Sequence, residues 1–209
     1  MQLLTIFSHP HADTYPAEVM HAFHEPFEQA GYSIDIADLH DEGFDPRFTK
    51  DDHSHYRSGG PIPPDVVAMQ RRVEAADRLA FIFPVYWWGM PAMMKGWIER
   101  VFTGGWAYPG TDNPDGGPRR LRNIPTALIG IGASGQKTYD KYGYDQAMRT
   151  QLEVGIFAYC GITDIERHMV YEVEGEHNAP ARQEGLSYAR SIGAAFSAAD
   201  RQPATSKKG

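Results

Sequence analysis

The sequence has almost no cysteine. Cys160 is the only one among 209 residues, so no disulfide can form within the chain, and zinc sites with four cysteine ligands are excluded. Cys160 ends an apolar run that starts at Ile156. In such a setting a buried, inert thiol is expected more often than a reactive one.

Long hydrophobic runs and excess positive charge are lacking as well. No stretch approaches the roughly 20 apolar residues of a membrane span. The apolar run at residues 3–7 has no basic lead and is too short for a signal peptide. We therefore expect a cytoplasmic protein without membrane insertion. The chain has 20 Lys and Arg against 27 Asp and Glu, a formal charge of −7, which argues against nucleic acid as a partner because phosphate contacts need a basic face.

Two further classes of site find no support. Without a G-x-S-x-G motif, an α/β-hydrolase would lack its nucleophile. His9 and His11 form a close pair, as do His53 and His55, but neither pair is accompanied by carboxylates at helical spacing. We therefore expect no metal site.

Five short apolar runs, each followed by a helix-like pattern, organise the chain. This alternation predicts a doubly wound α/β fold with a five-stranded parallel sheet and the flavodoxin strand order 2-1-3-4-5. Polar residues 38–52 and 53–64 predict loops. We interpret residues 1–198 as one domain and residues 199–209 as a disordered tail. The expected strands lie near residues 3–7, 34–36, 79–83, 126–131 and 164–173, and the expected helices near 15–30, 65–76, 91–102, 145–159 and 181–199.

Three loops are candidate sites, because ligands bind such sheets beyond the carboxyl ends of the strands. Residues 8–17 offer hydroxyls, an imidazole and a helix N-terminus that favours an anion. They match neither nucleotide fingerprint and also suit a plain capped helix start. Residues 84–91 contain three large aromatic side chains, which suit a planar heterocycle, a core or a subunit interface. Residues 130–135 are small enough for close approach of a ring, although they are also typical of a simple turn.

The block from Phe83 to Phe102, FPVYWWGMPAMMKGWIERVF, resembles the signature of the NAD(P)H:quinone oxidoreductases, which are flavodoxin-fold flavoenzymes related to DT-diaphorase. Residues 38–39 with 44–46, residues 64–67 with 74–77, and residues 159–161 extend the match. The resemblance covers nearly the whole chain up to residue 190. It implies a tightly bound flavin, a homodimer with active sites at its interface, and ping-pong hydride transfer from NAD(P)H to a quinone-type acceptor.

The resemblance also implies roles for individual residues. The first loop would hold the phosphate moiety of the flavin, the second loop its ring and the third loop its pyrimidine edge. A catalytic tyrosine beside the ring, an arginine near the adenosine part and two aromatic residues at the acceptor pocket complete the set. By position these residues are, in the same order, His9, Thr14, Tyr15, Pro16 and Ala17; Pro84, Val85, Tyr86, Trp87 and Trp88; Gly130, Ile131, Gly132 and Ala133; Tyr139; Arg182; and Trp106 and Tyr108.

Three positions depart from the family pattern. Pro16 stands where Asn or Ser is usual, which removes one side-chain contact to the phosphate region. Asp145 stands where the relative nearest in pattern has a histidine. That histidine is thought to offset negative charge on the reduced flavin, whereas an ionised carboxylate would add to this charge. Asp145 is therefore either protonated, turned to orient Tyr139 or Tyr144, or misaligned. The substrate loop is reduced to Tyr108-Pro109-Gly110, which predicts a different acceptor pocket.

Several alternatives stay open at this point. The length of the first loop and Arg182 favour FAD over FMN, whereas no residue decides between NADH and NADPH as the hydride donor. A flavodoxin-type electron carrier and an accessory flavoprotein of a potassium-efflux transporter are the two rival functions.

Overall fold

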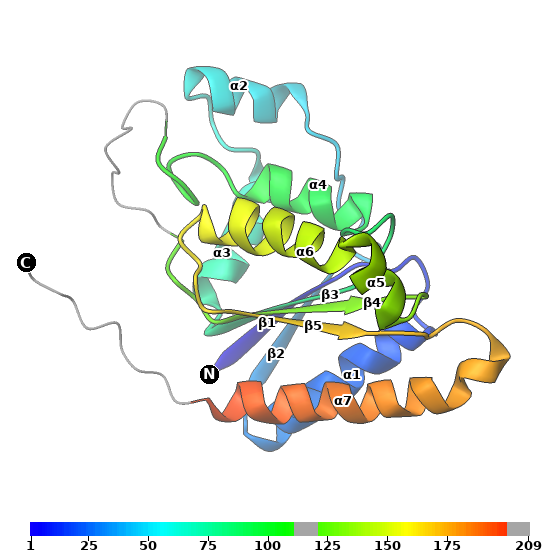
Figure 1. The fold of residues 1–209 in the computed structure, drawn as a ribbon. Helices are drawn as coiled ribbons and strands as arrows, with labels where there is room; N and C mark the ends of the chain where they lie inside the picture. The colour runs from blue at the N-terminus through cyan, green and yellow to red at the C-terminus, as the bar shows by residue number, and fades with distance from the viewer. Residues whose placement is uncertain (111–120, 200–209) are drawn as a thin grey trace, which may run out of the picture.

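A five-stranded parallel sheet with helices on both faces forms the body of the molecule (Figure 1). The computed structural model describes residues 1–110 and 121–199. The strands are β1 (Gln2–Phe7), β2 (Ser33–Asp38), β3 (Arg78–Pro84), β4 (Thr126–Ile131) and β5 (Ile165–Val170). Their order, β2-β1-β3-β4-β5, confirms the predicted flavodoxin-like arrangement.

The central strands are apolar because both of their sides are covered by helices. Every residue of β3 and β4 is buried, as expected for parallel strands inside a doubly wound sheet. On one face lie α1 (Tyr15–Gln29) and α7 (Ala179–Ala198); on the other lie α3 (Pro64–Ala75), α4 (Ala92–Val101) and α6 (Tyr144–Met148), which continues as the π-helix η1 (Arg149–Ala158). A short 3₁₀ turn, η2 (Glu176–Asn178), leads into α7.

Two helices were not predicted from the sequence. The expected loops over residues 38–52 and 53–64 are wrong where they meet, because α2 spans Lys50–Ser58. The second additional helix, α5 (Gln136–Tyr142), follows the glycine-rich loop after β4. Both helices lack the apolar periodicity that marks the longer ones, so the hydrophobic pattern gave no signal for them.

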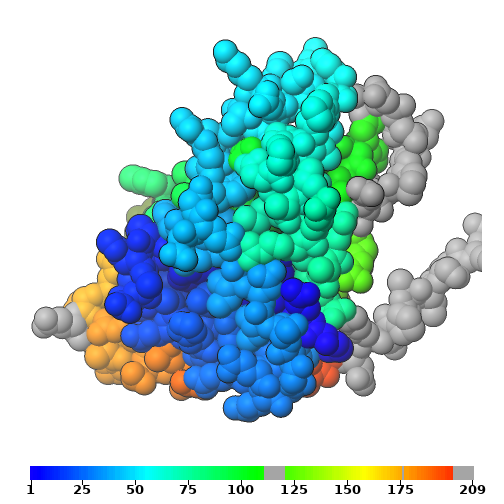
Figure 2. Space-filling view, turned by 180° about the vertical axis from the view of Figure 1, so that it is seen from behind, coloured from blue at the N-terminus to red at the C-terminus, as the bar shows by residue number. Residues whose placement is uncertain are grey.

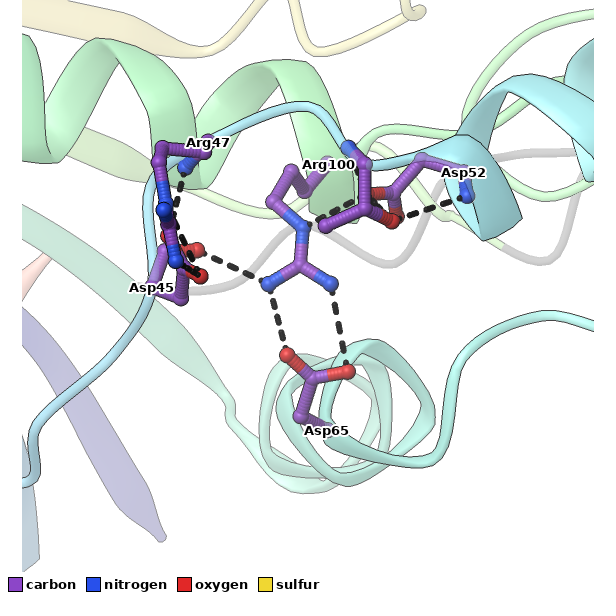
Figure 3. A network of polar contacts seen from close by, with 6 residues as sticks. Asp45, Arg47, Asp52, Asp65 and Arg100 are labelled. Carbon is purple, nitrogen blue, oxygen red and sulfur yellow. Dashed lines mark hydrogen bonds and ion pairs between the residues drawn. The ribbon is translucent and has the colours of Figure 1, made fainter.

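Local capping and one buried cation hold α2 in place. Thr49 and Asp52 form a reciprocal capping box, and Gly59 ends the helix in the left-handed region with φ 65°. The guanidinium of Arg100 donates from Nε to Asp52 at 2.9 Å and from Nη1 to Asp65 at 2.6 Å (Figure 3). These bonds tie α2 to α3 and α4, while α2 itself projects beyond the layered body (Figures 1 and 2).

Two predictions remain, one on the C-terminal tail and one on membrane-spanning helices. Residues 200–209 of the expected tail lie outside the described residues, and so do residues 111–120 of the loop after α4. Within the described part of the chain, no helix is both long enough and apolar enough to cross a membrane.

Candidate functional site

The three candidate loops meet at one edge of the sheet. The backbone N–H of Val85 donates to Ile131 at 2.8 Å, which joins the loops after β3 and β4. The loop after β1 lies beside them because β1 pairs with β3 along Leu3–Phe7. The structure therefore brings together the segments that the sequence analysis selected.

The first loop presents a helix N-terminus that no side chain caps. Thr14, the N-cap residue of α1, makes no side-chain bond to the first turn, and its hydroxyl instead donates to the carbonyl of His11 at 3.2 Å. The ring of His9 also stays within the loop, with Nδ1 at 2.9 Å from the same carbonyl oxygen. The first-turn N–H groups of α1, at the positive end of the helix dipole, are therefore available to bind an external anion.

Ser8 adds an unsatisfied hydroxyl to this loop. The residue is 1% exposed, and its Oγ has no hydrogen-bond partner among the described residues. The Oγ atom is enclosed by protein and faces no open space, so it does not by itself mark a ligand contact. The uncapped start of α1 is the feature of this loop that fits the phosphate moiety of a nucleotide cofactor.

A strained turn presents the aromatic residues of the second loop. Tyr86 and Gly89 exchange two backbone hydrogen bonds of 3.1 Å, and the residues between them, Trp87 and Trp88, have φ values of 49° and 61°. L-residues pay about 1–2 kcal/mol each for this left-handed conformation. The Trp87 side chain is 96% exposed, so the turn displays a large ring that contributes little to the core.

Trp88 belongs to an aromatic cluster with two tyrosines. Its ring stacks on Tyr144 with centroids 3.7 Å apart and 11° between the planes, and it meets Tyr139 edge to face at 5.3 Å. Tyr139 is 1% exposed, and burial, followed by the nearby Tyr171, raises the pKa of its phenol to about 12. Tyr139 therefore keeps its proton throughout the physiological range and offers an O–H donor.

The third loop needs its glycines. A Cβ atom at Gly132 would lie 2.6 Å from the hydroxyl oxygen of Tyr139, and one at Gly130 would lie 2.7 Å from the sulfur of Met169. Ala133 follows directly, and Ile131 is buried below the loop. The hydroxyl of Tyr139 is therefore held over the backbone of this loop, where only a glycine leaves space for it.

The structure pairs Asp145 with a cation. Its carboxylate accepts two hydrogen bonds from Arg167, at 2.9 and 3.0 Å, so it is turned toward β5 and paired with a cation. Arg167 also donates to Glu153 at 2.7 Å. The partner of Asp145 could not be found from the sequence, because it lies 22 positions further along the chain.

Tyr15 and Arg182 join the first loop to the start of α7. The Tyr15 hydroxyl donates to the backbone carbonyl of Arg182 at 2.8 Å, and burial together with Glu18 raises the pKa of Tyr15 to about 12 against the opposing effect of Arg182. The Arg182 guanidinium donates to the carbonyls of Val173 and Gly175. Arg182 is thus near the first loop, and part of its hydrogen-bonding capacity holds the segment after β5.

Tyr108 lines a separate apolar cavity of about 430 Å³ between α2, α4 and η1. Trp106 does not line this cavity: it is 2% exposed, and its indole N–H donates to Glu74 at 2.8 Å. The other lining residues were not predicted as a site, because only the fold brings α2, α4 and η1 together. The Thr49–Asp52 capping box followed by Gly59 is the signal that could have revealed α2. The lining consists of Phe48, His53, Tyr56, Ile98, Glu99, Phe102, Tyr108, Gly155, Ile156, Tyr159 and Cys160.

Comparison with known proteins agrees with this geometry. A family model described as flavodoxin-like fold matches residues 1–192. NAD(P)H dehydrogenase [quinone] 1 of Rattus norvegicus is 31% identical over 190 residues, which cover 81% of this chain and 68% of the relative. An NAD(P)H oxidoreductase of Haemophilus influenzae is 28% identical over 79% of this chain and 81% of its own length. Among solved structures, an NAD(P)H:quinone oxidoreductase from Methanothermobacter marburgensis superimposes with a TM-score of 0.86 at 25% identity, over 97% of this chain and 99% of the other.

Proposed function

Because the chain belongs to the NAD(P)H:quinone oxidoreductase family of flavodoxin-like fold, we propose that it is a flavin-dependent enzyme. It would use NAD(P)H to reduce quinones or similar aromatic acceptors. The donor and the acceptor would occupy the same site in turn, in a ping-pong cycle. A bound flavin would supply the redox chemistry by accepting hydride and passing electrons on.

The observation that carries this proposal is the uncapped N-terminus of α1 at the edge of the sheet where the three loops meet. Its first-turn N–H groups, which no side chain caps, favour an anionic, hydrogen-bonding ligand. A flavin nucleotide fits because its phosphate moiety would meet these groups, together with His9, Thr14, Tyr15, Pro16 and Ala17. Pro16 itself has no N–H to offer, so the other N–H groups of the first turn must do the binding.

The aromatic and glycine loops would hold the ring of the flavin. Residues 84–88 supply stacking surface, above all Trp87 with its 96% exposed side chain. Residues 130–133 leave backbone accessible at the pyrimidine edge. Tyr139 would be the catalytic residue, since its protonated hydroxyl can donate a hydrogen bond to negative charge that develops beside Gly132.

We favour FAD over FMN as the flavin. The Tyr15 hydroxyl bond to the Arg182 carbonyl keeps the beginning of α7 beside the first loop, which supports a role for Arg182 near an adenosine moiety. FMN is the alternative flavin, and the hydride donor is NADPH or NADH.

The acceptor pocket would be completed by a second copy of the chain. The cavity beside Tyr108 is rich in exposed aromatic side chains: Phe48 is 46% exposed, Tyr56 50% and Tyr159 62%. An apolar surface of this kind is typical of an interface or a ligand site. We therefore propose a homodimer in which Tyr108 frames the acceptor, while Trp106 supports this region from the core. We further propose a cytoplasmic location, with no nucleic acid as a partner and no insertion into a membrane.

Mass identification of the flavin released from the purified protein, followed by kinetics with NADH and NADPH, tests this function. The expected result is FAD and steady-state quinone reduction with at least one nicotinamide. A flavin-loaded protein that does not oxidise NAD(P)H would instead be an electron carrier. Loss of potassium efflux in surface variants with intact reductase activity would favour the accessory role at a transporter.

A further inference from the structure

The two tyrosines that face Trp88 lie on a segment with little stability of its own. Tyr139 is on α5 and Tyr144 begins α6. α5 has seven residues and ends at Gly143, which has φ 71°, and α6 runs on into η1 as one helical stretch from Tyr144 to Ala158. A stretch of this length is marginal in isolation and α5 is shorter still, so their positions depend on tertiary contacts.

Arg167 on β5 forms an ion pair with this segment. Its Nη1 and Nη2 atoms bind the two carboxylate oxygens of Asp145 at 2.9 and 3.0 Å, and its Nε binds Glu153 at 2.7 Å. The Arg167 side chain is 10% exposed and the Asp145 side chain 44%. A guanidinium that binds a carboxylate through two parallel bonds fixes orientation as well as distance.

Asp145 connects this clamp directly to the aromatic cluster. It follows Tyr144, whose ring stacks on Trp88 at 3.7 Å, and it lies six positions after Tyr139, whose ring contacts Trp88 and Tyr171 at 5.3 and 5.1 Å. Stacking falls off steeply with separation, so a small shift of α6 would open the Trp88–Tyr144 contact.

We propose that Arg167 is a positioning residue, whose pair with Asp145 holds the α5–α6 segment so that Tyr139 and Tyr144 lie against Trp88 at the flavin-facing edge. The part that concerns the flavin rests on the proposed function. The hold on residues 136–148 does not depend on it.

Four variants separate this role from general stability. Arg167→Met removes the clamp, Asp145→Asn weakens it while leaving the bond to Glu153, and Arg167→Lys keeps the charge without the two-pronged geometry. Arg72→Met is the matched control, because Arg72 also bridges two carboxylates, Asp35 and Glu42, both at 2.7 Å, but at the opposite edge of the sheet.

Amide hydrogen exchange followed by mass spectrometry reports on the segment directly. We expect exchange in residues 136–148 to accelerate about tenfold in Arg167→Met and Asp145→Asn, less in Arg167→Lys, and not in Arg72→Met, in line with the size of measured pairwise couplings. Unchanged exchange in Arg167→Met, or equal acceleration in Arg72→Met, would overturn the proposal.

Flavin affinity supplies the second measurement. Titration of the flavin-free protein with FAD should give a Kd about tenfold higher for Arg167→Met than for the wild type. An unchanged Kd in a variant whose segment 136–148 has loosened would show that the clamp does not serve the flavin. If the wild type itself binds neither FAD nor FMN, the proposed function fails, and the exchange measurement alone then decides whether Arg167 holds the segment.

Discussion

At the scale of single residues, backbone strain gathers at one edge of the sheet. Trp87 and Trp88, after β3, and Glu172, after β5, have left-handed backbones with φ 49°, 61° and 60°. Each of these conformations costs free energy in the isolated fold. Their common location is explained if a ligand repays these costs.

Trp87 allows strain and binding to be separated. Trp87→Gly should raise the free energy of unfolding by about 1 kcal/mol, because glycine tolerates the left-handed conformation, while weakening flavin binding through loss of the exposed ring. Trp87→Ala loses the same ring but keeps the strain, so it should weaken binding without the gain in stability. Urea unfolding and FAD titration measure the two effects, and wild-type affinity in Trp87→Gly would contradict a role for the ring.

Tyr139 should act through its proton. Tyr139→Phe removes a hydroxyl without a hydrogen-bond partner among the described residues, so the free energy of unfolding should change by less than about 0.5 kcal/mol. The turnover number kcat for quinone reduction should fall about tenfold or more, since a donor to developing charge is lost.

The pH dependence of the wild type provides a further check on Tyr139. Because burial raises its pKa to about 12, the phenol stays protonated between pH 6 and pH 9. We therefore expect no decrease in kcat from deprotonation of Tyr139 in that range. A drop in kcat below pH 9 that Tyr139→Phe abolishes would count against the protonated donor.

At the scale of elements, the sequence predicted those that depend on apolar patterning. β3 is a buried run, and α1 has a regular apolar stripe, so both were found close to their observed bounds. The helix α2 was missed because its stability comes from a capping box and from Arg100, a residue 48 positions after Asp52. The pairing of Asp145 with Arg167 was out of reach for the same reason, since only the folded sheet brings β5 beside α6.

The Arg100 cluster should govern the stability of α2. The side chains of Arg100 and Asp52 are each 3% exposed, and removing one partner of such a buried pair leaves an uncompensated charge, which costs about 3 kcal/mol. Arg100→Met should therefore destabilise the protein by that order in urea unfolding. The control is Arg47→Met, because the Arg47–Asp45 pair is exposed and its loss should have little effect.

The same cluster predicts a response to acid. Burial opposes the charge of Asp52, but hydrogen bonds from Arg100 and Thr49 outweigh it, so the pKa of Asp52 lies below its usual value. A lowered carboxyl pKa means that the stabilisation is complete above about pH 4 and is lost as the pH falls through the folded-state pKa. Arg100→Met should unfold with a weaker pH dependence in this acid range; equal dependence in both proteins would contradict the assignment.

At the scale of the whole molecule, two surfaces remain to be explained by partners. One is the ligand edge of the sheet, and the other is the aromatic cavity between α2, α4 and η1. The sequence predicted the first, because parallel strands bring their carboxyl ends to one edge. It did not predict the second, which depends on the position of α2.

The proposed homodimer can be tested at Tyr159. This residue is 62% exposed and lines the cavity, so Tyr159→Glu would place a charge in an apolar interface and should shift the protein toward monomers in light scattering. Quinone turnover should fall while flavin content stays at the wild-type level. A dimer of unchanged stability would place the interface elsewhere, and Tyr188→Glu, at a 42% exposed position on α7, is the matched surface control.

We propose that one flavin site is formed by the uncapped start of α1, the Trp87–Trp88 turn and the glycine loop after β4. The most direct test is to denature the purified wild-type protein and identify the released chromophore by mass. We expect FAD at about one molecule per chain, with FMN as the alternative flavin. A colourless protein that also fails to take up FAD or FMN on titration would contradict it.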